Sequence, residues 1–184
     1  MKLTLIVLTS IIIFSSLTII AKSKKEKPAE LKIGDTAPNF ILPNEKGETV
    51  TFHNIPGNKV LYYYPMDSTP GCTKQACSLR DGHQDLKNKG ITVIGISSDS
   101  VDSHKKFAQN HKLPFTLLSD VKNEVAKLYG TAGTFMNSRI TFLVDEKNKI
   151  VKILKDIQVK SHAEQILKEF NLSPTTNNAT QKKN

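Results

Sequence analysis

The sequence has few of the residues that build metal and cofactor sites. Only two of its 184 residues are cysteines, Cys72 and Cys77, and no histidine pair follows them at a metal-binding interval. Two cysteines that are five positions apart also lack the ligand spacing of a zinc site. The nine glycines form neither a GxGxxG nor a GxxxxGK string, so no nucleotide-binding loop is indicated. We expect no metal and no cofactor.

Acidic residues are fewer than basic ones, at 17 against 26, which gives a net charge of +9. A basic protein can bind nucleic acid or an anionic membrane. Many of the lysines lie in residues 22–27 and in the C-terminal tail, and the others are scattered between acidic residues. No aromatic and basic patch is present, so we expect no nucleic-acid partner. With 38% apolar and 23% charged residues, the chain is typical of one globular domain, predicted at residues 31–172.

Residues 1–21 are predicted to be a signal peptide or an N-terminal membrane anchor, because residues 3–20 form an apolar run. Ala21 could end a signal sequence, although the two isoleucines before it match a cleavage site poorly. The lysines after the run outnumber Lys2 before it, which is the wrong charge asymmetry for clean export. We favour export, and we therefore expect a periplasmic or a membrane-anchored protein.

Two further segments are predicted to lie outside the fold. Residues 22–30 form a charged linker, and residues 173–184 form a polar, unpatterned tail that we expect to be disordered.

Between these ends, short apolar runs rich in β-branched residues alternate with segments of helical periodicity. Strands are expected at residues 40–42, 49–52, 60–64, 91–96, 115–118, 140–144 and 150–154. Helices are expected from residue 70 and at residues 101–110, 123–129 and 161–170. This order predicts an α/β protein, a thioredoxin-like three-layer α/β sandwich with a central mixed sheet.

Both cysteines lie where the strand at 60–64 turns into a helix. Thr69 is placed to cap that helix, and Pro70 occupies its first position. The helix is expected to continue through Leu86, which lies at helical spacing from the apolar residues before it. Cys72 is therefore in the first turn, where unpaired backbone N–H groups and the helix dipole stabilise a thiolate.

Cys77 lies five residues further along the same helix. Positions i and i+5 are separated by about 140° around a helix axis and by about 7.5 Å along it. Because a disulfide needs two Cα atoms within roughly 7 Å, the pair can join only if the first turns unwind. Two buried, inert cysteines are the commoner outcome for such a pair, but the Thr-Pro-Gly before Cys72 favours a redox switch.

The motif around these cysteines is YPxxxTPGCTxQACxLRD, at residues 64–81. It resembles the active site of the peroxiredoxins, which are AhpC/TSA-like proteins, and specifically of the bacterioferritin comigratory protein (PrxQ) subfamily. The similarity extends over residues 31–170. The resemblance implies a monomeric thiol-dependent peroxidase that reduces hydrogen peroxide and organic hydroperoxides. It also implies a cysteine sulfenic acid and an intramolecular Cys72–Cys77 disulfide, which a thioredoxin-like dithiol reduces.

The resemblance further assigns roles to five residues. Cys72 attacks the peroxide and Cys77 resolves the product. Thr69 places its hydroxyl beside the thiolate and the peroxide, and Pro65 shields the nucleophile from solvent. Arg139, at the start of the predicted strand 140–144, supplies a planar cation for the sulfur and the peroxide oxygens. For Arg139 the resemblance is the only argument, because a lone arginine at a strand edge is usually solvated.

Other polar residues near the motif receive minor roles or none. Gln75 is expected at the edge of the site, Asp67 is assigned no role, and Tyr62, Tyr63 and Tyr64 are expected in the core and the pocket wall. The remaining candidates are dispersed histidines that we predict to be surface residues, namely His83, His104, His111 and His162.

Two alternatives share the predicted fold. An exported thiol–disulfide exchange protein normally carries Cys-x-x-Cys, and the wider spacing here argues against it. A copper-delivery protein would need cysteines three residues apart together with a distal histidine. The short segment 131–138 is similar to that of compact peroxiredoxins, and it leaves the preference among peroxides open.

Overall fold

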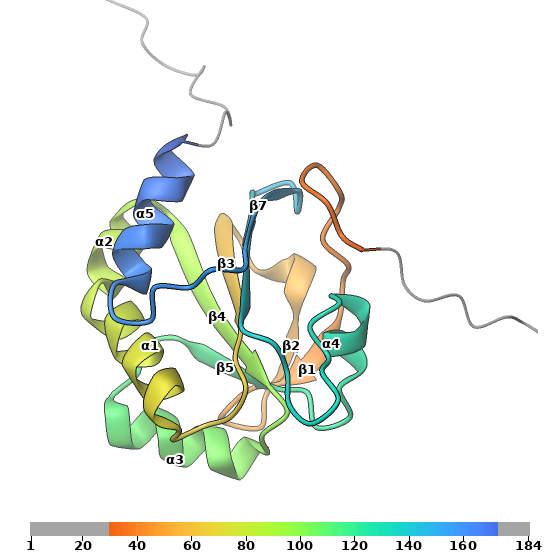
Figure 1. Cartoon of the computed structure of the whole chain (residues 1–184), viewed down its shortest axis with the longest axis vertical. Coiled ribbons are helices and arrows are strands. Elements are labelled where there is room, and N and C mark those ends of the chain that lie inside the picture. The colour runs from red at the N-terminus through yellow and green to blue at the C-terminus, as the bar shows by residue number, and fades with distance from the viewer. Residues whose placement is uncertain (1–29, 173–184) are drawn as a thin grey trace, which may run out of the picture.

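The computed structural model describes residues 30–172 (Figure 1). The predicted signal peptide or anchor, most of the linker and the predicted tail lie outside these residues. Within residues 30–172, no helix has the length and apolar character needed to cross a membrane.

A five-stranded mixed sheet forms the centre of the fold, in the order β5-β4-β3-β6-β7. Its strands are β3 (Asn58–Tyr63), β4 (Ile91–Ser97), β5 (Thr116–Ser119), β6 (Ile140–Val144) and β7 (Ile150–Leu154). β3 pairs in parallel with β4 and antiparallel with β6. A separate antiparallel hairpin joins β1 (Ile41–Pro43) to β2 (Thr49–Thr51). Its turn contains Gly47 at a φ of 81°, as its role as the turn residue requires.

Helices cover both faces of this sheet (Figure 1). They are α1 (Pro70–Asp81), α2 (His83–Asn88), α3 (Val101–His111), α4 (Glu124–Leu128) and α5 (His162–Leu172), with a short 3₁₀ helix, η1 (Phe52–Asn54). One apolar core joins the sheet to α1, α2, α3 and α5, and a second core on the opposite face joins it to α4 and η1. The predicted three-layer sandwich with a mixed sheet is therefore confirmed.

The alternation of side chains along β3 explains how one strand serves both cores. Val60 and Tyr62 belong to the core beneath α1, whereas Leu61 and Tyr63 belong to the opposite core. Tyr62 also needs space on the neighbouring strand, because a Cβ atom at Gly95 would lie 2.7 Å from its hydroxyl oxygen. All three predicted core tyrosines are fully buried.

The predicted helix through Leu86 is interrupted, and this prediction was wrong. α1 ends at Asp81, and Leu86 belongs to a second helix, α2. At the break, a Cβ atom on Gly82 would lie 2.4 Å from the Cβ of Ala163 in α5. Only glycine allows this close approach, so Gly82 lets α5 pack directly against the junction of α1 and α2.

Candidate active site

Cys72 lies in the first turn of α1, directly after the loop that follows β3. Its side chain is only 2% exposed. Thr69 is the N-cap residue, as predicted, but its hydroxyl does not cap the helix and instead donates to the carbonyl of Met66 at 3.1 Å. No side-chain cap occupies the N–H groups of the first turn, so the positive end of the helix dipole lies next to the buried Cys72 sulfur.

Arg139 is brought to this thiol by the sheet. β6 begins at the next residue, and Ile140 pairs with Tyr63 at the end of β3. The Arg139 Nη2 atom donates to the Cys72 Sγ atom at 3.3 Å. A Cβ atom on Gly71 would lie 3.3 Å from this Nη2, so the glycine leaves room for the guanidinium. The cation that the resemblance implied thus contacts the predicted nucleophile.

A buried chain of hydrogen bonds fixes the other side of the guanidinium. Arg139 Nη1 donates to Gln75 Oε1, and the Gln75 amide nitrogen lies 3.0 Å from His162 Nδ1. His162 Nε2 in turn lies 3.2 Å from the Thr141 hydroxyl. Because the amide oxygen of Gln75 accepts from Arg139, its NH₂ group donates to Nδ1. The remaining imidazole hydrogen is then on Nε2, which donates to Thr141.

His162 was predicted to be a surface residue, and this is wrong. Its side chain is completely buried between α1 and the sheet, at 0% exposure. Burial, reinforced by the positive charge of Arg139, lowers the pKa of His162 to about 3. The ring is therefore neutral, and it can hold Gln75 without adding a second positive charge beside the guanidinium.

This buried imidazole makes the stability of the fold depend on pH. The folded state resists protonation of His162 whereas the unfolded state does not, so stability falls as the pH drops from about 6.5 toward about 3. At about pH 5 we expect a loss of about 2 kcal/mol relative to neutral pH. In the His162→Gln protein this loss should be absent. Urea unfolding of both proteins at the two pH values measures the difference, and identical pH dependence would contradict the assignment.

His104 is the second histidine for which the surface prediction was wrong, since its exposure is also 0%. It contacts Asp67, a loop residue to which no role was assigned. His83 and His111, in contrast, are partly exposed. No local signal distinguishes the two buried histidines, because their partners lie 37 and 87 residues away in the sequence.

Cys77 lies on the same unbroken helix as Cys72 and is partly buried. Both thiols are free. Arg80, one turn further on, has its pKa raised by a hydrogen bond to Asp81 and by the neighbouring Cys77. The predicted resolving cysteine therefore lies on a different side of α1 from Cys72, as i and i+5 positions require.

Tyr62 lies in the same apolar core cluster as Cys72. Its ring stacks on Tyr64 at 5.3 Å between centroids and meets the His162 ring edge to face at 6.3 Å. Its hydroxyl is buried and has no hydrogen-bond partner among residues 30–172. Burial, followed by the negative charges of Asp67 and Cys72, raises the pKa of Tyr62 well above its ordinary value. The Tyr62 hydroxyl is therefore uncharged.

Comparisons with known proteins identify relatives of this chain. Residues 33–153 match the AhpC/TSA family. Peroxiredoxin Bcp of Escherichia coli (strain K12) is 42% identical over 146 residues, which cover 74% of this chain and 94% of that protein. The crystal structure of peroxidoxin BcpB from Mycobacterium tuberculosis has a TM-score of 0.73 and 31% identity, and the match covers 77% of this chain and 97% of that one.

A third relative is described by its activity. The bacterioferritin comigratory protein of Xanthomonas campestris, whose structures concern alkyl peroxide reduction, matches with a TM-score of 0.71 and 25% identity over 77% of this chain and 96% of its own. Neither the thiol–disulfide exchange protein nor the copper-delivery protein is favoured by these relatives. The chain therefore belongs to the AhpC/TSA family, in its bacterioferritin comigratory protein (peroxiredoxin Q) branch, and is a thiol-dependent peroxidase, which implies a peroxide substrate and a thioredoxin-type reductant.

Proposed function

We propose that Cys72 is the nucleophile that reduces hydrogen peroxide and organic hydroperoxides. The contact of 3.3 Å between the buried Cys72 sulfur and the Arg139 guanidinium carries this assignment. The thiolate attacks one peroxide oxygen, the O–O bond breaks, and the other oxygen leaves as hydroxide or alkoxide, which takes a proton to give water or an alcohol. Cys72 becomes a sulfenic acid.

Arg139 supports this step because its planar fork serves two partners at once. One nitrogen contacts the sulfur, the other is held by Gln75, and further N–H groups remain to donate to the peroxide. Charge that develops on the departing oxygen is stabilised by such donors in a site closed to water. Thr69 is the N-cap residue of α1, where its hydroxyl oxygen can accept a hydrogen bond from the peroxide O–H. Pro65 limits the access of solvent to Cys72.

Cys77 completes the cycle by attacking the sulfenic sulfur, which forms the disulfide and releases water. The first turns of α1 have to unwind for the two sulfurs to meet. The part of the helix beyond Cys77 is anchored separately, because the Ser78 hydroxyl accepts from the Ala163 amide at 3.3 Å. A thioredoxin-like dithiol then reduces the disulfide by thiol exchange, and the helix re-forms.

Replacing Cys77 with serine tests this cycle. After one equivalent of hydrogen peroxide, we expect the unaltered protein to lose two hydrogens as the Cys72–Cys77 disulfide. The Cys77→Ser protein should gain one oxygen at Cys72, and excess peroxide should drive it to the sulfinic acid because no thiol resolves the intermediate. Mass spectrometry of peptides distinguishes these products. A disulfide between two chains, or oxidation of other residues, would contradict the proposed cycle.

We also propose that the protein is an exported or membrane-anchored monomer. The apolar run at residues 3–20 supports export. An exported enzyme would meet its thioredoxin-like reductant outside the cytosol. Mass spectrometry of the mature N-terminus from periplasmic and membrane fractions distinguishes cleavage from anchoring, and sedimentation measures the oligomeric state.

A further inference from the structure

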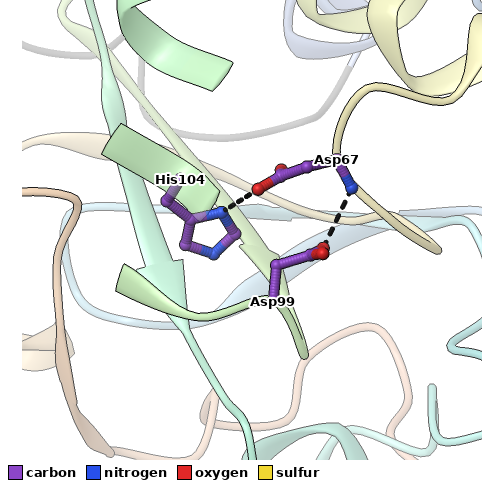
Figure 2. A group of neighbouring side chains, drawn as sticks. All are labelled: Asp67, Asp99 and His104. Atoms are coloured by element: carbon purple, nitrogen blue, oxygen red, sulfur yellow. Dashed lines mark hydrogen bonds and ion pairs between the residues drawn. The ribbon is translucent and has the colours of Figure 1, made fainter. Parts of the chain in front are cut away.

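A second buried polar cluster lies on the other side of the loop that leads into α1. It consists of Asp67 from that loop, Asp99 from two residues after β4 and His104 from α3 (Figure 2). Figure 2 shows Asp67 bonded to each of the other two, with its carboxylate directed at the imidazole and its backbone nitrogen directed at Asp99. The peroxidase chemistry described above uses none of these residues.

Asp67 holds the loop to the rest of the fold through four hydrogen bonds. Its carboxylate accepts from the hydroxyls of Tyr64 at 2.8 Å and Ser103 at 2.7 Å, and from His104 Nδ1 at 2.9 Å. Its backbone N–H donates to the Asp99 carboxylate at 2.9 Å. These bonds are needed because the next residue, Ser68, has a φ of 59°, a left-handed conformation that is unfavourable outside glycine.

His104 is paired at both ring nitrogens. Nδ1 faces the Asp67 carboxylate, and Nε2 lies 3.2 Å from the Leu118 carbonyl. Both partners are hydrogen-bond acceptors, so the two nitrogens connect the ring to the loop before α1 and to β5. Burial opposes ionisation of Asp67, but hydrogen bonds from His104, Ser103 and Tyr64 and the charge of His104 lower its pKa below the ordinary value. Both imidazole nitrogens lie within hydrogen-bond distance of protein oxygens, so the cluster is a hydrogen-bonded pair rather than a metal site.

α3 is attached to both ends of the segment that has to unwind. Near its start, Ser103 and His104 hold Asp67, which precedes Cys72. At its last residue, the His111 carbonyl accepts from Arg80, which follows Cys77, at 2.9 Å. Both cysteines therefore lie between two points that are fixed to the same helix.

We propose that Asp67 and His104 are positioning residues for the reaction of Cys72, which clamp the loop before α1 onto α3 and so hold the sulfur against Arg139. This inference rests on the proposed role of Cys72. The clamp fixes Thr69 and the start of α1 in the reduced enzyme. It also confines unwinding to the residues between Asp67 and Ser78, so that Cys72 returns to the same place after each cycle.

The experiment measures oxidation of Cys72 separately from disulfide formation. In a Cys77→Ser background, stopped-flow reaction with hydrogen peroxide gives the rate constant of the first step alone. We expect Asp67→Asn or His104→Asn to lower it about tenfold, because small displacements of reacting atoms are costly. Combining both substitutions should lower it little further, since each acts through the other. With Cys77 present, the rate of disulfide formation should be unchanged or faster.

Two further variants separate positioning from general stability. Ser103→Ala removes one hydrogen bond to Asp67 and leaves the bond between Asp67 and His104, so we expect a smaller loss of about twofold to threefold. This variant tests the clamp even if the other variants fold poorly. Tyr129→Phe removes a buried hydrogen bond to the Pro38 carbonyl on the opposite face of the sheet and should leave the rate constant unchanged.

The outcomes distinguish this inference from the proposed function. If the Cys77→Ser protein itself forms no sulfenic acid at Cys72, the proposed function fails. If that protein reacts and the Asp67, His104 and Ser103 variants react equally fast, only the clamp is overturned. Additive losses from Asp67→Asn and His104→Asn, or an equal loss in Tyr129→Phe, would also overturn it.

Discussion

Replacing Cys72 with serine is expected to reduce peroxide consumption to the uncatalysed background, a loss on the order of 10⁴-fold or more. A serine hydroxyl is not ionised near neutral pH, so the helix terminus and Arg139 have no anion to stabilise. Oxygen also cannot form the sulfenic acid on which the second half of the cycle depends. Hydrogen peroxide consumption coupled to oxidation of dithiothreitol measures the effect. Unimpaired turnover by Cys72→Ser would remove the proposed mechanism.

The matched control for this experiment is Cys77→Ser, which changes the same chemical group five residues away on the same helix. It should still consume about one equivalent of peroxide rapidly in its first turnover, because its nucleophile and cation are intact. Serine is nearly the same size as cysteine, so circular dichroism should show both proteins folded. A variant that folds but does not react then reports on the sulfur at position 72 alone.

Replacing Arg139 with alanine is expected to slow oxidation of Cys72 by about 10²-fold to 10³-fold, the usual cost of removing a preorganised donor from a developing negative charge. Arg139 contacts the sulfur with one nitrogen and Gln75 with the other. The substitution therefore removes the stabilising cation and leaves the Gln75 amide oxygen without its donor. The rate constant of the first step, measured with hydrogen peroxide in the Cys77→Ser background, tests this expectation.

Two comparisons make the Arg139 result specific. Arg139→Lys keeps the charge but has no planar fork, so it should recover only part of the rate. Lys152→Ala removes a cation from the neighbouring strand β7, where it pairs with Glu169 at 2.8 Å, and should leave the rate unchanged. Equal rates for Arg139→Ala and the unaltered protein would mean that the 3.3 Å contact has no part in catalysis.

Local sequence patterns predicted most of the elements. β6 and β7 have the expected bounds, because each is a β-branched run flanked by turn or polar residues. α3 begins after Ser100, whose hydroxyl accepts from the Ser103 amide as a cap does. The first hairpin strand is shifted by one residue, to Ile41–Pro43, and the second ends one residue early, at Thr51, because Phe52 begins a 3₁₀ helix. Boundaries of this kind depend on packing as well as on local preference.

The site was predicted less completely than the fold. Cys72 was predicted from its position at the start of a helix, and Cys77 from its spacing of five residues from Cys72. Arg139 was predicted from the family resemblance alone. His162, Thr141 and the pair of Asp67 and His104 were missed or misassigned. A polar residue that is buried with a distant partner has the same local sequence as one that faces solvent, so periodicity does not reveal it.

The sequence by itself determined the candidate nucleophile, since a cysteine after Thr-Pro-Gly at the start of a predicted helix and a second cysteine at i+5 are properties of nearby residues. Only the tertiary structure decided what surrounds that sulfur. Pairing of β6 with β3 brings Arg139 across 67 residues to Cys72, and packing of α5 on α1 brings His162 across 87 residues to Gln75. These contacts exist only once the sheet and helices have assembled, because no short segment of the chain can hold the groups together.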